Sequence, residues 1–355
     1  MRRFRGKLLA VAAVLLAALA GAGAGWLHHA YRTALLPVKP GTGTAVTVTI
    51  PQGASTAEIA RILYDKGLIR HPLAFRIRAR QAKLDGRLKA GVYRLHAGMS
   101  TPEILDKLAR GDILTARFTI PEGFTVAQII DGLVEMGLVD RDGFRAALNE
   151  AARDWPYLPE DAELREPLEG YLFPDTYQVP VGADGRVANP RIIVRAMLER
   201  FEAAFDRRRR ERARELGLSV HEVVTLASII EREAKVPDER PLISAVYHNR
   251  LRLGMKLDAD PTTLYAVGRT SGPLTRRDLG VDSPYNTYRY PGLPPGPIGA
   301  PGLGSIDAAL YPADTDYLYF VLRPDGSGRH RFARTLEEHN RNVRAWRAAT
   351  SSTKE

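Results

Sequence analysis

The sequence Val48-Thr-Ile-Pro-Gln-Gly53 recurs later in the chain as Phe118-Thr-Ile-Pro-Glu-Gly123. Each copy continues into an amphipathic run that ends on a glycine and two apolar residues, Gly67-Leu68-Ile69 and Gly137-Leu138-Val139. Apolar residues four positions apart within each run give a helix one apolar face. The repeat therefore predicts the same unit twice: a short strand, a Pro-x-Gly turn and a helix that ends at a glycine.

A further strand and helix are predicted between the two copies, from Gly91-Val-Tyr-Arg-Leu95 and Ser100-Thr-Pro-Glu-Ile-Leu-Asp-Lys-Leu108. Residues 45–112 are thus expected to form a small βαα(β) module, and residues 113–180 the second repeat with a junction. The module resembles the LysM-like domains, which bind the N-acetylglucosamine backbone of bacterial cell walls; a structural spacer is the alternative. Strands and helices mixed in this way predict an α+β fold.

The N-terminus combines a basic flank with a long apolar run. Residues 1–7 hold four arginines and lysines, and the run from Leu8 to Leu27 is uncharged. About twenty such residues are needed to cross roughly 30 Å of hydrocarbon. We predict a single transmembrane anchor at residues 8–28, a cytoplasmic tail before it and a linker at residues 29–44, with the remaining chain outside the cytoplasm. A cleaved signal peptide is the alternative, because Ala18-Leu-Ala20 resembles a cleavage site.

The composition narrows the function classes. The chain of 355 residues has no cysteine, which excludes a disulfide framework, a thiolate nucleophile and a cysteine-based zinc site. Its formal net charge of +10 favours an anionic partner such as acidic lipid or an acidic wall polymer. Because the N-terminal segment indicates export, nucleic acid is not expected as a partner. The run Arg207-Arg-Arg-Arg210, followed by Arg212 and Arg214, is interleaved with Asp206, Glu211 and Glu215, which favours a solvated helix face over a binding patch.

Two carboxylates lie inside the otherwise apolar segment Leu226-Ala-Ser-Ile-Ile-Glu-Arg-Glu-Ala-Lys235. Ser219-Val-His-Glu222 has the spacing of a capping box, so the helix is expected to begin near Val220. At about 100° per residue its apolar residues form one stripe, with Glu231 and Glu233 on opposite borders. Burial against apolar surface raises a carboxyl pKa toward the range of a general acid at neutral pH. The helix alone leaves open whether either glutamate is that acid or both lie on a solvated edge.

No metal or cofactor is expected. His221-Glu222 begins like a zinc-binding helix motif, but Thr225 stands where the second histidine ligand would be. Gly302-Leu-Gly-Ser305 lacks the glycine that follows a nucleophile-elbow serine. No Walker-type or dinucleotide-binding glycine pattern opens a helix.

Five motifs follow one another through the rest of the chain: Glu169-Gly-Tyr-Leu-Phe-Pro-Asp-Thr-Tyr177, Leu226-Ala-Ser-Ile-Ile-Glu-Arg-Glu-Ala234, His248-Asn-Arg-Leu-Arg-Leu-Gly-Met-Lys-Leu-Asp-Ala-Asp-Pro-Thr262, Ser283-Pro-Tyr-Asn-Thr-Tyr288 and Gly292-Leu-Pro-Pro-Gly-Pro-Ile-Gly-Ala-Pro-Gly302. Together they resemble the MltG/YceG-like endolytic murein transglycosylases. The resemblance includes the anchor, the LysM-like module and the closing His330-Arg-Phe332 and His339-Asn340 segments. It implies a mixed α/β catalytic domain over residues 181–348, followed by a tail at 349–355.

The resemblance implies that Glu233 is the catalytic residue. As an acid it would protonate the glycosidic oxygen between N-acetylmuramic acid and N-acetylglucosamine, and as a base it would then take the proton of the muramoyl 6-hydroxyl. That oxygen closes on C1 to give a 1,6-anhydro end, and an intramolecular nucleophile removes the need for a second protein carboxylate. Glu231 becomes a supporting residue, either with a structural role, such as bonding Arg250 or a backbone donor, or in contact with substrate.

The other motif residues are expected to bind substrate or to support Glu233, and they are Glu231, Asn249, Arg250, Asp260, Thr262, Tyr265, Asn286, Thr287, Tyr288, Glu169 and Asp175. As an alternative, Asp260 caps a helix that Pro261 opens. Glu169 and Asp175 could equally fix the junction between modules. The run from Pro291 to Gly302 predicts a long functional loop.

The resemblance further implies a protein of the cytoplasmic (inner) membrane that acts on peptidoglycan strands beside penicillin-binding glycan polymerases. Two other function classes stay open. One is a two-carboxylate hydrolase with Glu233 as acid and Asp260 as base or nucleophile, which would leave reducing ends. The other is a noncatalytic wall-binding or scaffold protein, in which both glutamates of the helix are structural.

Overall fold

The computed structural model describes residues 2–41, 43–160 and 163–351. Side chains are described for residues 13–41, 43–160 and 163–349. Parts of the two predicted terminal tails, residue 1 and residues 352–355, lie outside the described residues.

The chain divides into two compact units. The first consists of Met1–Ala116 and Pro180–Ala188, and the second of Arg117–Val179 and Asn189–Glu355. The second repeat therefore belongs to the same unit as the segment predicted to be catalytic, whereas residues 181–188 belong to the first unit. The reason is local: Val181 donates its N–H to Leu114 O at 3.1 Å, which ties this short excursion to the first unit.

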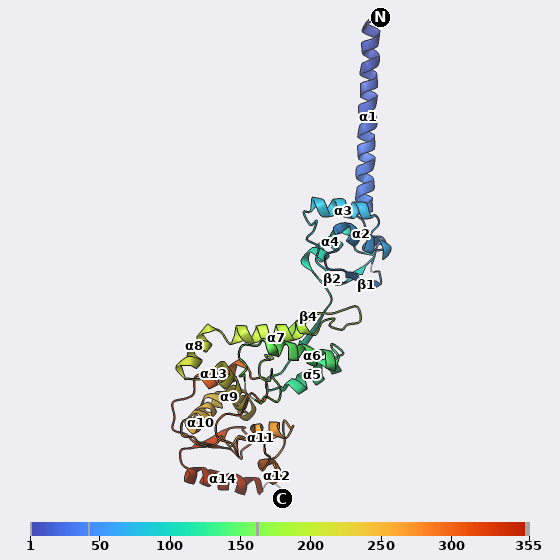
Figure 1. Cartoon of the computed structure of the whole chain (residues 1–355). Helices are drawn as coiled ribbons and strands as arrows, with labels where there is room; N and C mark the ends of the chain where they lie inside the picture. Colours follow the sequence, from blue (N-terminus) through green and yellow to red (C-terminus); the bar gives the residue numbers. More distant parts are fainter. Residues whose placement is uncertain (1, 42, 161–162, 352–355) are drawn as a thin grey trace. The chain divides into compact units, whose positions relative to one another are not determined.

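Helix α1 (Arg2–Ala34) opens the first unit (Figure 1). Within it, Ala13–Ala34 is long and apolar enough to cross a membrane, and none of that stretch is buried. The helix continues past residue 28, so the predicted linker begins as helix. Residues 26–34 contain no proline or glycine, and Pro37 is the first residue that cannot continue the helix.

The module in the first unit is built on two antiparallel strands, β1 (Ala45–Ile50) and β2 (Gly91–His96), with Val48 opposite Tyr93. Its helices are α2 (Thr56–Asp65), α3 (Pro72–Gln81) and α4 (Thr101–Arg110). The strand and helix predicted between the two repeats are thus confirmed as β2 and α4. One apolar core joins these elements and includes Ile59, Leu63, Phe75, Tyr93, Leu95 and Ile104.

The repeat predicted from the sequence is confirmed by β1 with α2 and by β3 (Thr115–Thr119) with α5 (Val126–Glu135). Each helix begins with a capping box, which is formed by Ser55 and Glu58 in α2 and by Thr125 and Gln128 in α5. The glycine after each helix has a left-handed φ of +67° in the first copy and +69° in the second. An L side chain rarely adopts that conformation, which explains a glycine at this point of both copies.

The second unit is mostly helical, with two small sheets. Strand β3 pairs with β4 (Thr176–Pro180), and β5 (Tyr319–Leu322) pairs antiparallel with β6 (His330–Ala333). Its remaining elements are α6 (Arg141–Arg153), α7 (Arg191–Ala204), α8 (Arg207–Glu215), α9 (Val220–Glu233), η1 (Pro237–Glu239), α10 (Arg240–Arg252), α11 (Asp260–Ala266), α12 (Arg276–Leu279), α13 (Leu303–Leu310) and α14 (Leu336–Ser351). The mixed α+β class is confirmed.

Helix α9 is the central helix of the second unit and packs on α8, α10, α11 and α13. The predicted capping box is present, since the Ser219 hydroxyl accepts from Glu222 N and the Glu222 carboxylate accepts from Ser219 N. The predicted single apolar stripe is wrong, because every residue from Val223 to Ile230 is buried. Neighbouring elements cover the middle of α9 on all sides, so only its first turn, with Glu222, and its last turn, with Glu231 and Glu233, reach a surface.

The run from Pro291 to Gly302 packs along α9. Ser228 accepts a hydrogen bond from Ile298 N at 3.0 Å, and His221 Nε2 lies 2.7 Å from Pro295 O. Residues 296–302 are buried, so this part of the predicted functional loop acts as a strap that holds the helix.

Candidate active site

Two pockets of the second unit meet at Glu233. One has a volume of about 460 Å³ and is bounded by β5, α14 and the segment before α11. The other, of about 560 Å³, is bounded by the turn of the second repeat, the end of α9 and residues 270–272. Glu233, Asp260, Leu322 and His330 line both pockets. The last residue of α9 therefore lies where two cavities adjoin.

The half-buried Glu233 side chain has the properties of a proton donor. Burial raises its pKa to about 7, and the negative charge of Asp260 acts in the same direction. The Tyr247 hydroxyl donates to Glu233 Oε1 at 3.3 Å, and this hydrogen bond and the charge of Lys235 oppose the rise. A carboxyl group with such a pKa can both donate and accept a proton near neutral pH.

Asp260 is the second carboxylate at the junction of the pockets. It is exposed, and its Oδ1 accepts from the Tyr288 hydroxyl at 2.5 Å. The alternative that Asp260 caps the helix is wrong, because the N-cap of α11 is Ala259 and Asp260 is the first helical residue. Asp260 and Tyr288 therefore come together beside Glu233, as expected of residues that support it.

Glu231 has a different environment from Glu233, although only one residue separates them. Its side chain is 8% exposed and bonds two groups, Arg240 Nη2 at 3.2 Å from Oε1 and Gly302 N at 3.0 Å from Oε2. The backbone donor proposed as its partner is thus Gly302. The cation is Arg240 and not Arg250. Glu231 joins α9 to α10 and to the end of the strap.

The turn of the second repeat supplies a wall residue that the sequence analysis did not single out. Glu122 lies in the second pocket, 3.5 Å from Arg240, and burial together with the charge of Glu231 raises its pKa. A Cβ at Gly302 would displace the Glu122 carboxylate, which shows how closely the end of the strap approaches this turn. The sequence does distinguish Glu122, because the first copy of the repeat has Gln52 at the equivalent position.

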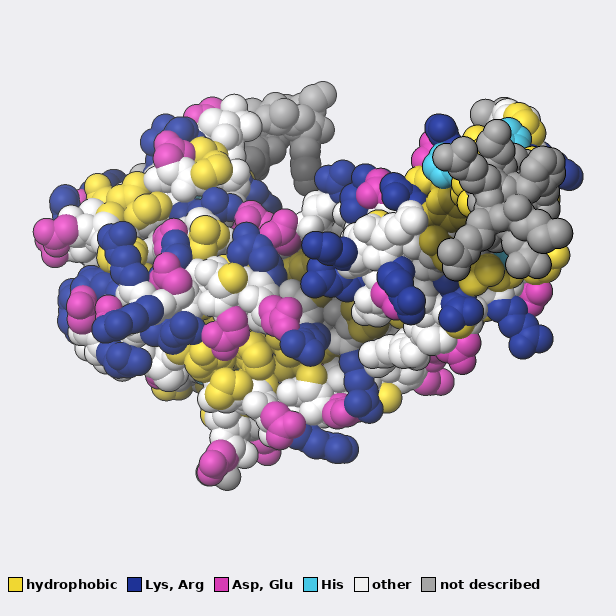
Figure 2. Space-filling model, turned by 90° about the horizontal axis from the view of Figure 1, so that it is seen from above, with side chains coloured by type: hydrophobic (Ala, Val, Ile, Leu, Met, Phe, Trp, Pro, Cys, Tyr) yellow, Lys and Arg dark blue, Asp and Glu magenta, His cyan; other side chains and the backbone are white. Residues whose placement is uncertain are grey.

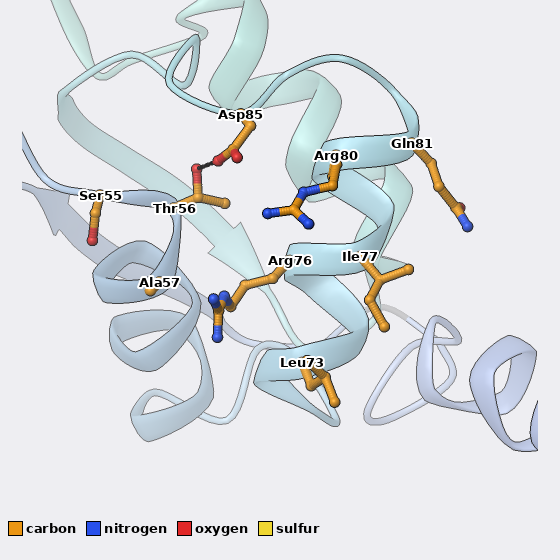
Figure 3. Close-up of a pocket in the computed structure, with 9 residues that line it drawn as sticks. All are labelled: Ser55, Thr56, Ala57, Leu73, Arg76, Ile77, Arg80, Gln81 and Asp85. Atoms are coloured by element: carbon orange, nitrogen blue, oxygen red, sulfur yellow. Dashed lines mark hydrogen bonds between the residues drawn. The ribbon is translucent and has the colours of Figure 1, made fainter.

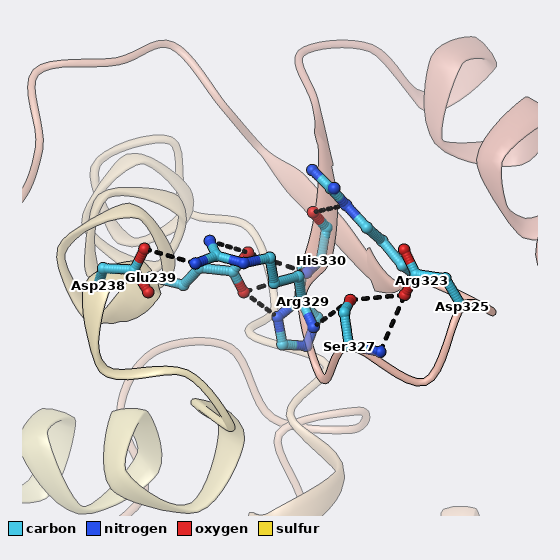
Figure 4. A network of polar contacts seen from close by, with 7 residues as sticks. All are labelled: Asp238, Glu239, Arg323, Asp325, Ser327, Arg329 and His330. Atoms are coloured by element: carbon cyan, nitrogen blue, oxygen red, sulfur yellow. Dashed lines mark hydrogen bonds and ion pairs between the residues drawn. The ribbon is translucent and has the colours of Figure 1, made fainter.

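His330, which lines both pockets, is held by a buried carboxylate (Figure 4). Glu239 lies 2.8 Å from His330 Nδ1 and also accepts the backbone N–H of His330 at 3.0 Å. Nδ1 is thus the ring nitrogen that contacts Glu239. Arg329 bonds Asp238 at 2.8 Å and Arg323 bonds His330 O at 3.1 Å, which fixes β6 against the residues before α10.

Three of the predicted site residues form a buried scaffold under the cleft. The Thr262 and Thr287 hydroxyls lie 2.8 Å apart, and Thr287 also accepts from Ala259 N at 3.0 Å. Asn286 accepts from Thr263 and donates to the carbonyls of Leu279 and Val281. Each of the three is at most 1% exposed. Their bonds place Asp260 and Tyr288.

Asn249 and Arg250 fasten the end of α10 to neighbouring backbone. Asn249 donates to the carbonyls of Thr315 and Tyr317 at 2.8 and 2.9 Å. Arg250 donates to the carbonyls of Leu318, Lys256 and Leu257 and pairs with Asp258. Arg250 lines the first pocket, so of these two residues only Arg250 faces the cleft.

The remaining predicted residues, Glu169, Tyr265 and Asp175, are hydrogen-bonded to other parts of the second unit. Glu169, 2% exposed, accepts from Val126 N at 2.9 Å and from the Tyr265 hydroxyl at 3.0 Å. Burial raises the Glu169 pKa to about 8. Asp175 bonds Arg200 at 2.5 Å, and this partner holds its pKa below the usual range. Glu169 and Tyr265 thus connect α5 with α11. Because these residues are far apart in the sequence, no local pattern predicts the contact.

The basic run of α8 is largely paired with acidic side chains. Arg207 bonds Glu211 at 2.7 Å, Arg209 bonds Asp307 at 2.7 Å and Arg210 bonds Glu202 at 2.8 Å. On the face in Figure 2 lysines and arginines are likewise interspersed with acidic side chains. The predicted solvated face fits Arg207, which is 89% exposed, but not Arg209, which is 20% exposed.

Comparisons with known proteins identify the family of the chain. A protein of Bacillus subtilis (strain 168) named endolytic murein transglycosylase is 35% identical over 321 residues, which are 87% of this chain and 87% of that protein. A protein of the same name from Streptococcus pneumoniae serotype 2 is 30% identical over 367 residues, which cover 95% of this chain but only 65% of the pneumococcal protein. The crystal structure of a YceG-like protein from Listeria monocytogenes matches 84% of this chain and 99% of its own, with a TM-score of 0.57 and 36% identity. The family model of the YceG-like family matches residues 48–345. Because this model matches most of the chain, and the B. subtilis protein is 35% identical with 87% of both chains covered, the chain belongs to the YceG-like family.

Proposed function

We propose that the protein is an endolytic lytic transglycosylase of peptidoglycan, with Glu233 as its acid and base. The observation that carries the proposal is a single carboxyl group with a pKa raised to about 7 at the meeting point of two pockets. The names of the related proteins from B. subtilis and S. pneumoniae support the same reaction.

In the first step, protonated Glu233 donates to the oxygen that links C1 of N-acetylmuramic acid to N-acetylglucosamine. The C1–O bond breaks with its electron pair going to that oxygen, and C1 gains oxocarbenium character. In the second step, the muramoyl 6-hydroxyl adds to C1 and its proton passes to the Glu233 carboxylate. The enzyme returns to its starting protonation state, no water is consumed, and a pKa near neutrality suits both steps.

Two pockets that share Glu233 suit cleavage inside a strand, because sugars can lie on both sides of the broken bond. Tyr288 borders one side of this junction, Glu122 and Arg232 border the other, and Asp260 lines both pockets. His330 contributes to both walls. We assign these side chains to substrate positioning.

Mass spectrometry of the products tests the proposal. Purified, uncrosslinked glycan strands are incubated with the full chain in detergent or with its Glu233→Gln variant. We expect the unmodified protein to release internal fragments that end in 1,6-anhydromuramic acid. The Glu233→Gln variant should form them more slowly by the roughly 10²–10⁴-fold typical of a missing general acid–base group. No cleavage by the unmodified protein would favour a noncatalytic binding protein.

A two-carboxylate hydrolase is the second candidate, because Asp260 lines both pockets beside Glu233. In that reaction water replaces the 6-hydroxyl and the fragments carry reducing ends. The same spectra separate the two, since a hydrolysed fragment is heavier by one water than an anhydro fragment.

We infer that α1 anchors the protein in the cytoplasmic membrane with its N-terminus in the cytoplasm. The apolar stretch Ala13–Ala34 and the basic residues before it support this orientation. The second unit would then act outside the cytoplasm, beside membrane-bound penicillin-binding glycan polymerases. Binding of glycan by the LysM-like module over residues 45–112 stays a prediction.

A further inference from the structure

Helix α3 of the first unit carries an exposed face that is both apolar and basic. Leu73, Arg76, Ile77 and Arg80 are exposed and lie three or four positions apart, so they share one side of the helix. Phe75, on the other side, is fully buried in the module core. Leu73 and Ile77 are 53% and 39% exposed. Large apolar side chains beside arginines on one helix face are typical of helices that lie in a membrane interface.

The charge of the module complements an anionic surface. Helix α3 contains three arginines and no acidic residue. Residues 45–116 contain twelve lysines and arginines against six aspartates and glutamates. The acidic residue next to this face, Asp85, accepts a hydrogen bond from the Thr56 hydroxyl at 2.5 Å. Positive charge is therefore concentrated on the helix itself.

Hydrogen bonds at both ends of α3 tie it to the end of the predicted anchor. The Tyr31 hydroxyl, in the last turn of α1, donates to Gln81 Oε1 at 2.8 Å. Arg70, just before α3, donates to the carbonyls of Leu36 and Pro37. Because both ends of α3 are held at the same end of α1, α3 runs across that end, as Figure 1 shows.

The same end of α1 has the composition of a membrane interface. Trp26 is 70% exposed, and Tyr31 follows within the same stretch. Trp and Tyr are enriched where a transmembrane helix leaves the hydrocarbon. The module sheet lies on the far side of α3 from α1 in Figure 1, so one side of this helix is turned toward the sheet and the other toward the side from which the anchor arrives.

We propose that the exposed face of α3 docks on the anionic phospholipid surface of the membrane that α1 spans. Leu73 and Ile77 enter the boundary between headgroups and acyl chains, and Arg76 and Arg80 bind lipid phosphates. The arginines border a pocket of about 540 Å³ that also includes Thr56 and Asp85, which gives headgroups room beside the helix (Figure 3). This inference rests on the proposed anchoring by α1.

Site-specific fluorescence tests the docking, and the absence of cysteine from the chain makes each label unique. The full chain with Ile77→Cys is labelled with an environment-sensitive dye and reconstituted into vesicles of phosphatidylglycerol and phosphatidylcholine. Arg94→Cys, at an exposed position on β2, is the matched control. We expect blue-shifted emission and quenching by lipid-borne nitroxides for the Ile77 label, and neither effect for the Arg94 label.

Charge variants and lipid composition test the chemistry. Arg76→Gln and Arg80→Gln, each made in the Ile77→Cys chain, should lower the ratio of docked to undocked protein by roughly fivefold per arginine removed. Pure phosphatidylcholine or high salt should lower it as well. Cleavage of isolated glycan strands in detergent should stay unchanged in both variants, because neither residue lies in the second unit.

The outcomes separate docking from anchoring. Flotation of the vesicles reports whether the chain is inserted, independently of the label. Inserted protein in which the Ile77 and Arg94 labels behave alike would overturn the docking of α3 and leave the anchor intact. Protein that fails to float would refute the anchor itself. A label at Ile77 that responds to added glycan strands but not to lipid would assign this face to sugar binding and overturn the proposal.

Discussion

The Tyr247 hydroxyl, on α10, donates a hydrogen bond at 3.3 Å to Oε1 of Glu233, the last residue of α9. The hydrogen bond favours the ionised carboxylate and therefore opposes the rise that burial imposes on the Glu233 pKa. Tyr247 itself is 1% exposed, so its hydroxyl is confined to this position. Tyr247 therefore moderates the pKa of Glu233 from within the core.

Tyr247→Phe should raise the pKa of Glu233, because the ionised form loses its hydrogen bond while burial remains. The alkaline limb of kcat/KM, which reports loss of the acid form near pH 7, should move to higher pH. The rate at the optimum should fall by about tenfold or less, since such a bond contributes roughly 0.5–1.5 kcal/mol. An unchanged limb in the pH profile would show that the contact does not tune the acid.

Asp260→Asn should move the same limb in the opposite direction. The charge of Asp260 disfavours ionisation of Glu233, so its removal lowers the Glu233 pKa and shortens the pH range in which the acid is protonated. Product analysis across pH 5 to 9 measures the shift. A loss of all activity, with reducing ends in the products of the unmodified enzyme, would instead identify Asp260 as a hydrolytic base or nucleophile.

Glu231→Gln should affect folding more than chemistry. The variant keeps the shape of the side chain but loses the charge that pairs with Arg240, and the cost for such a buried group is about 1–3 kcal/mol. Denaturant unfolding measures this loss. At temperatures where the variant is folded, its cleavage rate should stay well above that of Glu233→Gln. Equal rates for the two variants would contradict the division of roles between them.

Glu169→Gln should weaken the dependence of stability on pH. The folded-state pKa of Glu169 is about 8, above its ordinary value of 4.5, so the folded protein binds more protons between these two values. Stability contributed by the protonated group is fully present below about pH 4.5 and declines as pH rises toward 8, with a slope of up to about 1.4 kcal/mol per pH unit. Unfolding curves at pH 5 and pH 8 should therefore differ less for the variant. An identical difference in both proteins would mean that Glu169 is not the titrating group.

Local patterns predicted the repeat and the helix starts, because capping boxes and terminal glycines act within a few residues. The surroundings of α9 could not be predicted in that way. Burial on every side depends on α10, α11 and α13, and the strap that holds α9 is more than sixty positions away from Ser228 in the chain. A helix sequence alone therefore suggested one apolar stripe.

The candidate site shows the same limit. Resemblance to a family predicts Glu233 as the catalytic residue. Tyr247, which bonds Glu233, and Glu122, which lines one of the same pockets, come from segments whose local sequence has no catalytic pattern. Thr262 and Thr287 are distant in sequence and meet only through the fold. The sequence predicts that they bind substrate or support Glu233, and in the structure their bonds position Asp260 and Tyr288. Which polar residues face a cleft depends on packing that spacing does not encode.

The meeting of two pockets at Glu233 has a consequence for strand length. An active site with room on both sides of the reacting bond has no fixed reference to either terminus, so it cannot count sugars from an end. The length of the released strand would then depend on the relative rates of elongation and cleavage. After each added disaccharide, the strand has the same probability of being cleaved. Such a process gives a geometric distribution of lengths, whose mean changes with the ratio of the two rates and not with the dimensions of the protein.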